Sequence, residues 1–168
     1  MMPSRDVGSG ELRVGGLEGD RQAALTRGAS KQMPWYPHRA PVFNLRQVLV
    51  VSEDDCATIA TQMGLPKLDA ALICPNIVVS GIEQFSRLPP GTRLQFASGA
   101  TIYVTDPNFP CHQIAGIIAT ALGDPGLAKR VVKAAYGYRG VMAMVEREGH
   151  IATGDRVTVV RNRAHELD

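Results

Sequence analysis

Cys111 is the residue whose position most favours chemistry, because a strand is expected to stop and a helix to begin there. Residues 101–105 are β-branched and aromatic, and the Asp-Pro-Asn sequence at 106–108 is strong turn chemistry. Apolar residues recur at helical spacing from 114 to 122, so Cys111 falls near the helix N-cap. Unpaired N–H groups and the helix dipole are expected to stabilise a thiolate there, which is the reactive form of cysteine.

His112 and the other two cysteines bear on the role predicted for Cys111. His112 could supply a proton acceptor or a positive charge, whereas the alternative for Cys111 is a small buried hydrophobe. Cys56 lies near the apolar face of another expected helix and is predicted to be core. The spacing of Cys74 and Cys111 leaves open whether the two thiols lie close together.

A glycine-rich turn at residues 15–21 is the second candidate, because it brings backbone amides together with Asp20 and Arg21. Such a loop lets the backbone approach a ligand closely, with Arg21 available to a phosphate. A plain connection between strands is the alternative. The loop at residues 33–39 carries the only tryptophan, Trp35, together with Arg39. It could line a pocket, or Trp35 could anchor the loop to the core.

Composition narrows the class of protein. The chain has 168 residues, 45% hydrophobic and 20% charged, which suits one globular domain. A formal net charge of +2 gives no electrostatic case for a dedicated nucleic-acid binder, although anionic small molecules remain possible. No apolar run is long enough for a membrane span or a signal peptide, and three cysteines suit a reducing compartment. A cytoplasmic protein is expected.

Many short strands and about three helices are expected from the remaining pattern. Residues 11–160 should form one domain, with residues 1–10 as a flexible leader and 161–168 as a tail. This predicts a mainly β fold with helical insertions, closed like a β-barrel. The expected strands are residues 47–51, 76–80, 93–96, 101–105, 141–145 and 156–160, and the expected helices begin after Ser52, at Cys111 and at 124–126.

Several separated sequence strings together resemble the MOSC domain, named for the C-terminal part of molybdenum cofactor sulfurase. Their order and spacing carry the resemblance, which covers about residues 11 to 160. The strings are Gly16-Leu-Glu-Gly-Asp20-Arg21, Asn76-Ile-Val-Val-Ser-Gly81, Leu88-Pro-Pro-Gly91-Thr-Arg-Leu94, Pro110-Cys111, Arg139-Gly-Val-Met-Ala-Met-Val145 and Gly149-His-Ile151-Ala-Thr-Gly154-Asp155-Arg-Val157.

The resemblance implies a fold related to the pyruvate kinase β-barrel domain, built around one family cysteine that aligns with Cys111. Members of the family are viewed as sulfur carriers or binders of the molybdenum cofactor, and some reduce N-hydroxylated compounds with molybdenum held by that cysteine. The family string Gly-Glu-Asn is Cys74-Pro75-Asn76 here, so only Asn76 carries over. The histidine that often follows the glycine-aspartate pair is Arg21 here. The pyridoxal-phosphate domain of the sulfurase is absent from this chain.

Three hypotheses follow for the function. The first is a standalone module that carries sulfur as a persulfide on Cys111 or binds molybdenum cofactor, with a cysteine desulfurase or a molybdoenzyme as partner. The second is a molybdenum-dependent oxidoreductase, with Cys111 as metal ligand and a separate electron-donor protein. The third is a barrel that only mediates protein contacts. The candidate cofactor-binding residues are Asp20, Arg21, Arg39, Asn76, His112 and Arg139, the arginines because a guanidinium binds phosphate bidentately.

Overall fold

The computed structural model describes residues 3–161 and contains short strands, three α-helices and two 3₁₀ turns. The mainly β composition with helical insertions is as predicted. In chain order the elements are β1 (Ser9–Arg13), β2 (Gly16–Leu17), β3 (Thr26–Gly28), β4 (Pro41–Phe43), β5 (Val48–Ser52), α1 (Glu53–Met63), η1 (Ala70–Ile73), β6 (Ile77–Val79), η2 (Phe85–Arg87), β7 (Arg93–Phe96), β8 (Thr101–Pro107), α2 (His112–Ala121), α3 (Leu127–Ala134), β9 (Val141–Arg147), β10 (Gly149–Ala152) and β11 (Val157–Val160).

A six-stranded sheet in the order β11-β7-β8-β9-β5-β6 forms the body, and a three-stranded sheet, β10-β1-β2, continues it. All pairs in the body are antiparallel except β5 with β6. Register shifts between β8 and β9 mark irregularities that bend paired strands and increase their twist. The sheet is curled but open, with β11 and β6 at its edges. The expected closed barrel is therefore corrected to a curled half-barrel.

Strand β5 lies between two hydrophobic cores and is buried at all five positions. Because side chains alternate along a strand, Val48 and Val50 enter one core while Leu49 and Val51 enter the other. The first, the sheet core, fills the curl and includes Leu12, Phe85, Leu94, Ile102 and Val145. The second, the helix core, lies under the helices and includes Ile59, Met63, Ile73, Ile118 and Val131.

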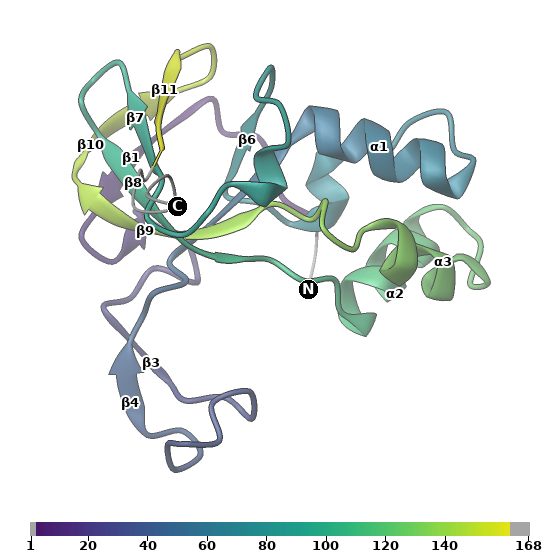
Figure 1. Ribbon diagram of the computed structural model, residues 1–168, viewed down its shortest axis with the longest axis horizontal. Coiled ribbons are helices and arrows are strands. Elements are labelled where there is room, and N and C mark those ends of the chain that lie inside the picture. The colour runs from purple at the N-terminus through teal and green to yellow at the C-terminus, as the bar shows by residue number, and fades with distance from the viewer. Residues whose placement is uncertain (1–2, 162–168) are drawn as a thin grey trace, which may run out of the picture.

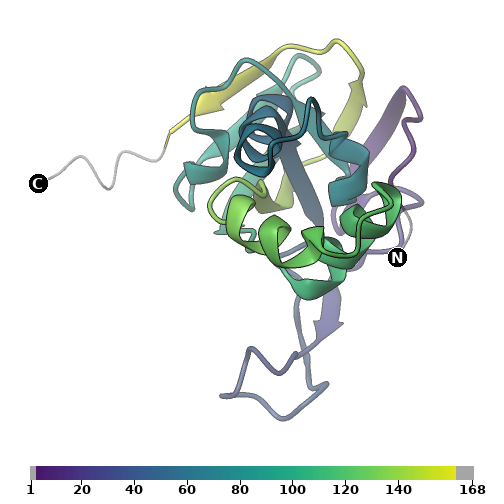
Figure 2. The ribbon, with the colours of Figure 1, turned by 90° about the vertical axis from the view of Figure 1, so that its right-hand side faces the viewer.

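The three α-helices gather on one side of the molecule (Figures 1 and 2). Helix α1 begins as predicted, because Ser52 at the N-cap accepts a hydrogen bond from Asp54 N, and it ends at Gly64 with φ of 69°. Helix α3 starts at Leu127 with Gly126 as N-cap, later than the predicted start at Asp124. Instead, Asp124 Oδ1 accepts a hydrogen bond from Gly126 N. In the described part of the chain no helix is long and apolar enough to cross a membrane.

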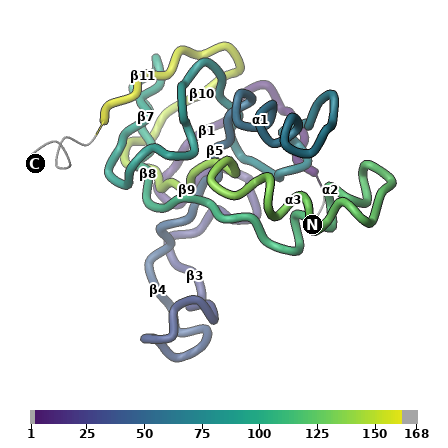
Figure 3. Tube along the Cα trace, turned by 45° about the vertical axis from the view of Figure 1, so that its right-hand side comes forward, coloured from purple at the N-terminus to yellow at the C-terminus, as the bar shows by residue number. Residues whose placement is uncertain are grey.

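The hairpin of β3 and β4 projects away from both the sheet and the helices (Figure 3). Residues 22–40 showed no periodicity, so this arm was not predicted. Trp35 at its tip is 67% exposed and packs on Tyr36, with ring centroids 6.2 Å apart. Trp35 therefore does not anchor the loop to the core.

The start of the described chain is held to the body. Ser4 N donates to Ala71 O at 3.0 Å, and Ser4 Oγ donates to Pro75 O at 2.6 Å. Strand β1 begins at Ser9, within the segment expected to be a flexible leader. Most of the expected tail, residues 162–168, lies outside the described residues, whereas Arg161 is described and exposed.

A buried polar chain joins α1 to the segment before β9. Asp55 Oδ2 accepts hydrogen bonds from Ser86 N at 3.0 Å and Ser86 Oγ at 2.5 Å. Ser86 Oγ in turn accepts from Gly140 N at 2.7 Å. Burial raises the pKa of Asp55, while the hydrogen bonds from Ser86 act in the opposite direction.

This network predicts a pH dependence of stability. Because the folded protein holds the Asp55 proton more tightly than the unfolded chain, protonation stabilises the fold. The contribution is fully present below the ordinary value of 3.8 and is lost as pH rises through the raised folded pKa. Asp55→Asn keeps an acceptor for Ser86 but cannot ionise. Urea unfolding from pH 3.5 to 7 should show wild type losing stability relative to Asp55→Asn as pH rises, whereas parallel profiles would contradict this.

Candidate functional site

A cavity of about 410 Å³ opens between the base of the β3–β4 arm and the ends of several elements of the body. Its size falls within the range of small-molecule and cofactor sites. We call it the arginine cavity, because four arginines from three stretches of the chain line it. The lining residues are Arg21, Gln22, Ala24, Arg27, Asn44, Arg46, Leu49, Ile73, Cys74, Asn108, Arg139 and Met142.

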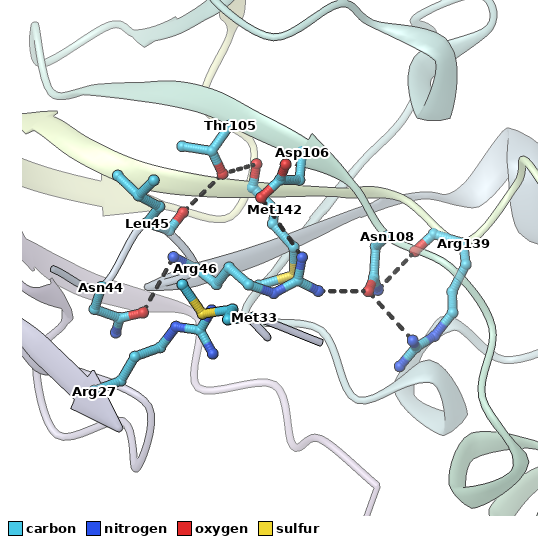
Figure 4. A network of polar contacts seen from close by, with 10 residues as sticks. All are labelled: Arg27, Met33, Asn44, Leu45, Arg46, Thr105, Asp106, Asn108, Arg139 and Met142. Carbon is cyan, nitrogen blue, oxygen red and sulfur yellow. Dashed lines mark hydrogen bonds and ion pairs between the residues drawn. The ribbon is translucent and has the colours of Figure 1, made fainter. Parts of the chain in front are cut away.

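Asn108 fixes two of these arginines. Its side chain is buried, with 5% of the residue exposed, and its Oδ1 accepts from Arg46 Nη2 at 3.3 Å and Arg139 Nη1 at 3.2 Å. Asn108 Nδ2 donates to Arg139 O at 3.3 Å, which ties the loop after β8 to the start of β9. Figure 4 shows both guanidinium groups converging on this one amide. One neutral acceptor thus holds two positive charges close together.

The positive charge of the cavity is only partly balanced by protein groups. Arg46 Nη1 lies 3.7 Å from Asp106 Oδ2. Burial lowers the pKa of Arg46, Asp106 raises it, and the charges of Arg27 and Arg139 lower it further. Within residues 3–161, the buried Nε atoms of Arg27 and Arg139 have no hydrogen-bond partner. Unsatisfied guanidinium donors in an electropositive cavity suit an anion with several oxygens, such as a phosphate.

Cys111 takes the predicted position at the N-cap of α2, with extended φ and ψ of −128° and 163°. It is exposed, and its side chain makes no capping hydrogen bond. Arg139 Nη1 donates to Phe109 O at 2.6 Å, which holds the loop leading to Cys111. Burial lowers the pKa of Arg139, and interactions with Cys111 and then Cys74 raise it. The guanidinium that lines the cavity beside Cys74 therefore also positions the loop before Cys111.

The structure brings together some of the predicted site residues. Arg21 and Arg139 line the arginine cavity, and Arg139 holds the loop that leads to Cys111 through its hydrogen bond to Phe109 O. Asp20 lies next to Arg21 and stabilises the turn, because its Oδ1 accepts from Gln22 N at 2.7 Å. His112 is the exposed first residue of α2.

Five predicted residues lie outside the cavity lining: Asp20, Cys111 and His112, described above, and Arg39 and Asn76. Arg39 is exposed near the start of β4 in the projecting arm, with φ of 65°. Asn76 takes part in backbone pairing, because its Oδ1 accepts from Leu49 N at 2.7 Å and its N–H donates to Leu49 O at 2.9 Å. It thereby aligns the end of η1 with β5. Neither residue faces the cavity in this structure.

Sequence reasoning missed Arg27, Arg46, Asn44 and Asn108 as cavity residues. Asn44 is buried and holds the segment after β2, since its Nδ2 donates to Gln22 O and Ala24 O at 3.2 and 3.1 Å. One signal was available in the sequence. No aspartate or glutamate occurs from residue 21 to residue 52, although this stretch carries four arginines and a lysine. In a chain with a net charge of +2, such a one-sided stretch indicates an anion-binding region.

The chain belongs to the MOSC domain family, which it matches over residues 37–158. It is similar to YuaD of Bacillus subtilis (strain 168), a protein named as a candidate in metal-sulfur cluster biosynthesis. The two are 36% identical over 150 residues, which cover 89% of this chain and 78% of YuaD. The family resemblance inferred from the sequence strings is thereby confirmed.

Solved structures support the same fold. The crystal structure of Bacillus subtilis YuaD matches with a TM-score of 0.89 and 33% identity, covering 94% of this chain and 87% of that one. YiiM from Geobacillus stearothermophilus matches with a TM-score of 0.56 and 16% identity, covering 94% and 79%. YiiM from Escherichia coli matches with a TM-score of 0.59 and 17% identity, covering 92% of this chain and 63% of that one. At these identities the YiiM structures show the fold alone.

Proposed function

We propose that this protein carries sulfur as a persulfide on Cys111 for metal-sulfur cofactor assembly, and that the arginine cavity binds the anionic group of the acceptor. One observation carries the proposal: Arg139 lines the cavity and also donates a hydrogen bond to Phe109 O, two residues before the exposed Cys111. A sulfur carrier needs an accessible thiol that a donor protein can reach. The name of YuaD agrees with this role.

Loading of Cys111 needs no oxidant. The Cys111 thiolate attacks the outer sulfur of a donor persulfide, the donor cysteine leaves as a thiolate, and the sulfur atom moves with its oxidation state unchanged. A cysteine desulfurase is the donor class that presents such a persulfide. Cys111 suits this exchange because it is exposed at a helix N-terminus, where the dipole favours an anionic sulfur.

The molybdenum cofactor fits the chemistry of the cavity. Its pterin carries a phosphate, for which Arg21, Arg27, Arg46 and Arg139 would supply cationic donors. The unsatisfied Nε atoms of Arg27 and Arg139 favour such an occupant. Bound there, the cofactor would supply a redox-active metal that binds soft sulfur ligands. Cytoplasmic location and transfer to a molybdoenzyme belong to this proposal.

A second candidate is a molybdenum-dependent reductase of N-hydroxylated compounds, with Cys111 as the metal ligand. It is favoured by the same link between cavity and thiol, since Arg139 both lines the cavity and holds the loop that leads to Cys111. It requires a separate electron-donor protein, because no flavin, haem or iron–sulfur motif is visible in the sequence. Retention of cofactor through purification would distinguish this candidate from a carrier.

The test compares wild type with Cys111→Ser, and with Cys56→Ser as a control that removes a buried core thiol. Each protein is treated with a cysteine desulfurase and L-cysteine, and persulfide is measured by alkylation and mass spectrometry. Molybdenum and pterin are measured after purification from a host that makes the cofactor. Cys111→Ser should lose at least nine-tenths of the persulfide, and Cys56→Ser should retain it. Equal loading of wild type and Cys111→Ser, or no loading of either, would refute the carrier proposal.

A further inference from the structure

Cys74 lies in an unusual backbone conformation on the wall of the arginine cavity. It follows η1 with φ of 60° and ψ of 48°, the left-handed region that favours glycine or asparagine. For a residue with a side chain this conformation costs about 1 kcal/mol. Within residues 3–161 only Arg39 and Gln84 share a positive φ without being glycine. The backbone conformation therefore does not favour a cysteine at this position, which lines the cavity, and its Sγ donates a hydrogen bond to Leu72 O at 3.9 Å.

The two cysteines lie at the ends of packed elements. Cys74 is the C-cap of η1 and Cys111 is the N-cap of α2, and η1 contacts α2. The helix core contains Ile73, which directly precedes Cys74. It also contains Ala115, one helical turn after Cys111. Arg139 lines the same cavity as Cys74 and donates a hydrogen bond to Phe109 O, two residues before Cys111. Chain segments that are 37 positions apart in sequence are thus joined through one guanidinium and one core.

The two thiols differ in access. Cys111 is exposed, whereas Cys74 is half-buried and lines the cavity. Burial raises the pKa of Cys74, and the charges of Arg139 and Arg21 partly offset this. A donor protein therefore meets the thiol of Cys111 first, while a ligand inside the cavity lies against Cys74.

We propose that Cys74 accepts the sulfur atom from Cys111 and holds it as a persulfide inside the arginine cavity, beside the anionic acceptor. This inference rests on the proposed role of Cys111 as a sulfur carrier. It assigns the two thiols successive positions in one transfer: Cys111 takes sulfur from a protein donor, and Cys74 presents it to a small phosphorylated acceptor.

The transfer is balanced without any other reagent. The Cys74 thiolate attacks the outer sulfur of the Cys111 persulfide, one sulfur–sulfur bond forms as another breaks, and Cys111 leaves as a thiolate. The proton lost by Cys74 passes to solvent or to Cys111. The position of Cys111 at the N-terminus of α2 favours it as the leaving thiolate. A thiolate leaving group of this kind favours attack on the outer sulfur over attack on the inner one.

The experiment follows the labelled sulfur over time. The protein is treated with a cysteine desulfurase and L-[³⁵S]cysteine, trapped by alkylation, and digested with trypsin. Cleavage after Arg46, Lys67, Arg87, Arg93 and Lys129 places the three cysteines in three different peptides. In wild type the label should appear on the Cys111 peptide first and on the Cys74 peptide later. In Cys111→Ser the Cys74 peptide should carry at least tenfold less label.

Two substitutions at Cys74 keep the test independent of folding. Cys74→Ser keeps the size of the side chain, and Cys74→Gly suits the left-handed backbone, so at least the glycine variant should fold. In either variant the Cys111 persulfide should form normally and persist at least tenfold longer in the presence of a phosphorylated pterin. Turnover of the Cys111 persulfide at the wild-type rate in both variants would overturn the inference.

Other outcomes separate this inference from the proposed function. Label that stays on Cys111 and never reaches Cys74 would overturn the relay and leave the carrier role intact. Equal labelling of Cys74 in wild type and Cys111→Ser would overturn the relay, because Cys74 would then load directly. A Cys74–Cys111 disulfide formed with release of sulfide would also overturn it, since the inner sulfur would have been attacked. Absence of label from all three peptides would overturn both proposals.

Discussion

Gly140→Ala is expected to lower the free energy of unfolding by about 3 to 5 kcal/mol, a large part of the roughly 5 to 15 kcal/mol by which a domain is typically stable. Gly140 has φ of 83°, and a Cβ built there would lie 2.1 Å from Val50 O and 3.0 Å from Val51 Cγ2. Val50 O is backbone of the central strand β5, so the contact cannot be relieved by a side-chain rotation. Relief requires β9 to move away from β5, which disrupts both cores that β5 separates.

Gly137→Ala provides the matched control. Gly137 has φ of 79°, nearly the same as Gly140, but a Cβ there would meet nothing within 4 Å. The Gly137→Ala substitution should therefore lower the free energy of unfolding only by the cost of an alanine at positive φ, about 1 kcal/mol. Urea unfolding at neutral pH measures both variants against wild type. Similar losses for the two alanines would show that contact with Val50 does not constrain Gly140.

Arg139→Met is expected to weaken binding of inorganic pyrophosphate by roughly 10- to 100-fold, which equals about 1.4 to 2.7 kcal/mol. The substitution removes one of four guanidinium groups from the cavity and the donor that holds Phe109 O. It also leaves Asn108 Oδ1 with Arg46 alone as a side-chain donor. The cavity should therefore lose positive charge, and its remaining groups should be less well positioned, because the loop before Cys111 is no longer held by Arg139.

Two variants separate the effect of position from that of charge. Arg93→Met removes the same charge at the surface, where Arg93 pairs with Glu146, and should change pyrophosphate affinity less than twofold. Arg139→Lys keeps the charge but lacks the planar fork, so its affinity should fall between wild type and Arg139→Met. Isothermal titration calorimetry at low ionic strength measures all four proteins. An equal loss in Arg93→Met and Arg139→Met would mean that net charge alone governs binding.

The order of elements was largely predictable because local signals agreed with the final fold. Helix α1 begins after Ser52 and ends at Gly64, as the capping rules predict. The residue pattern from 101 to 122 correctly predicted Cys111 at the start of α2. These signals depend on residues close together in sequence. Closure of the sheet depends instead on the pairing and register of distant strands, so the closed barrel was predicted in place of a curled, open sheet.

The candidate site was less predictable, for a related reason. Arg21 and Arg139 belong to sequence strings that resemble the family. Arg27 and Arg46 lie at the base of an arm whose sequence shows no hydrophobic periodicity. Asn108 was read as a turn residue, which it is, but its second role of holding two guanidinium groups requires the spatial approach of the segments before β5 and β9. Such convergence cannot be deduced from spacing along the chain.

The arginine cavity is assembled from five stretches of chain: residues 21–27, 44–49, 73–74, 108 and 139–142. No one stretch supplies more than two of the four arginines, so neither a partly folded chain nor an isolated fragment offers the same concentration of charge. Any ligand of the cavity binds the native state and not the unfolded chain. By mass action, a ligand at one hundred times its dissociation constant would add about 2.7 kcal/mol to the stability of the whole fold. Loss of that ligand would therefore expose an emptied protein more readily to unfolding and proteolysis, linking its lifetime to the supply of what it binds.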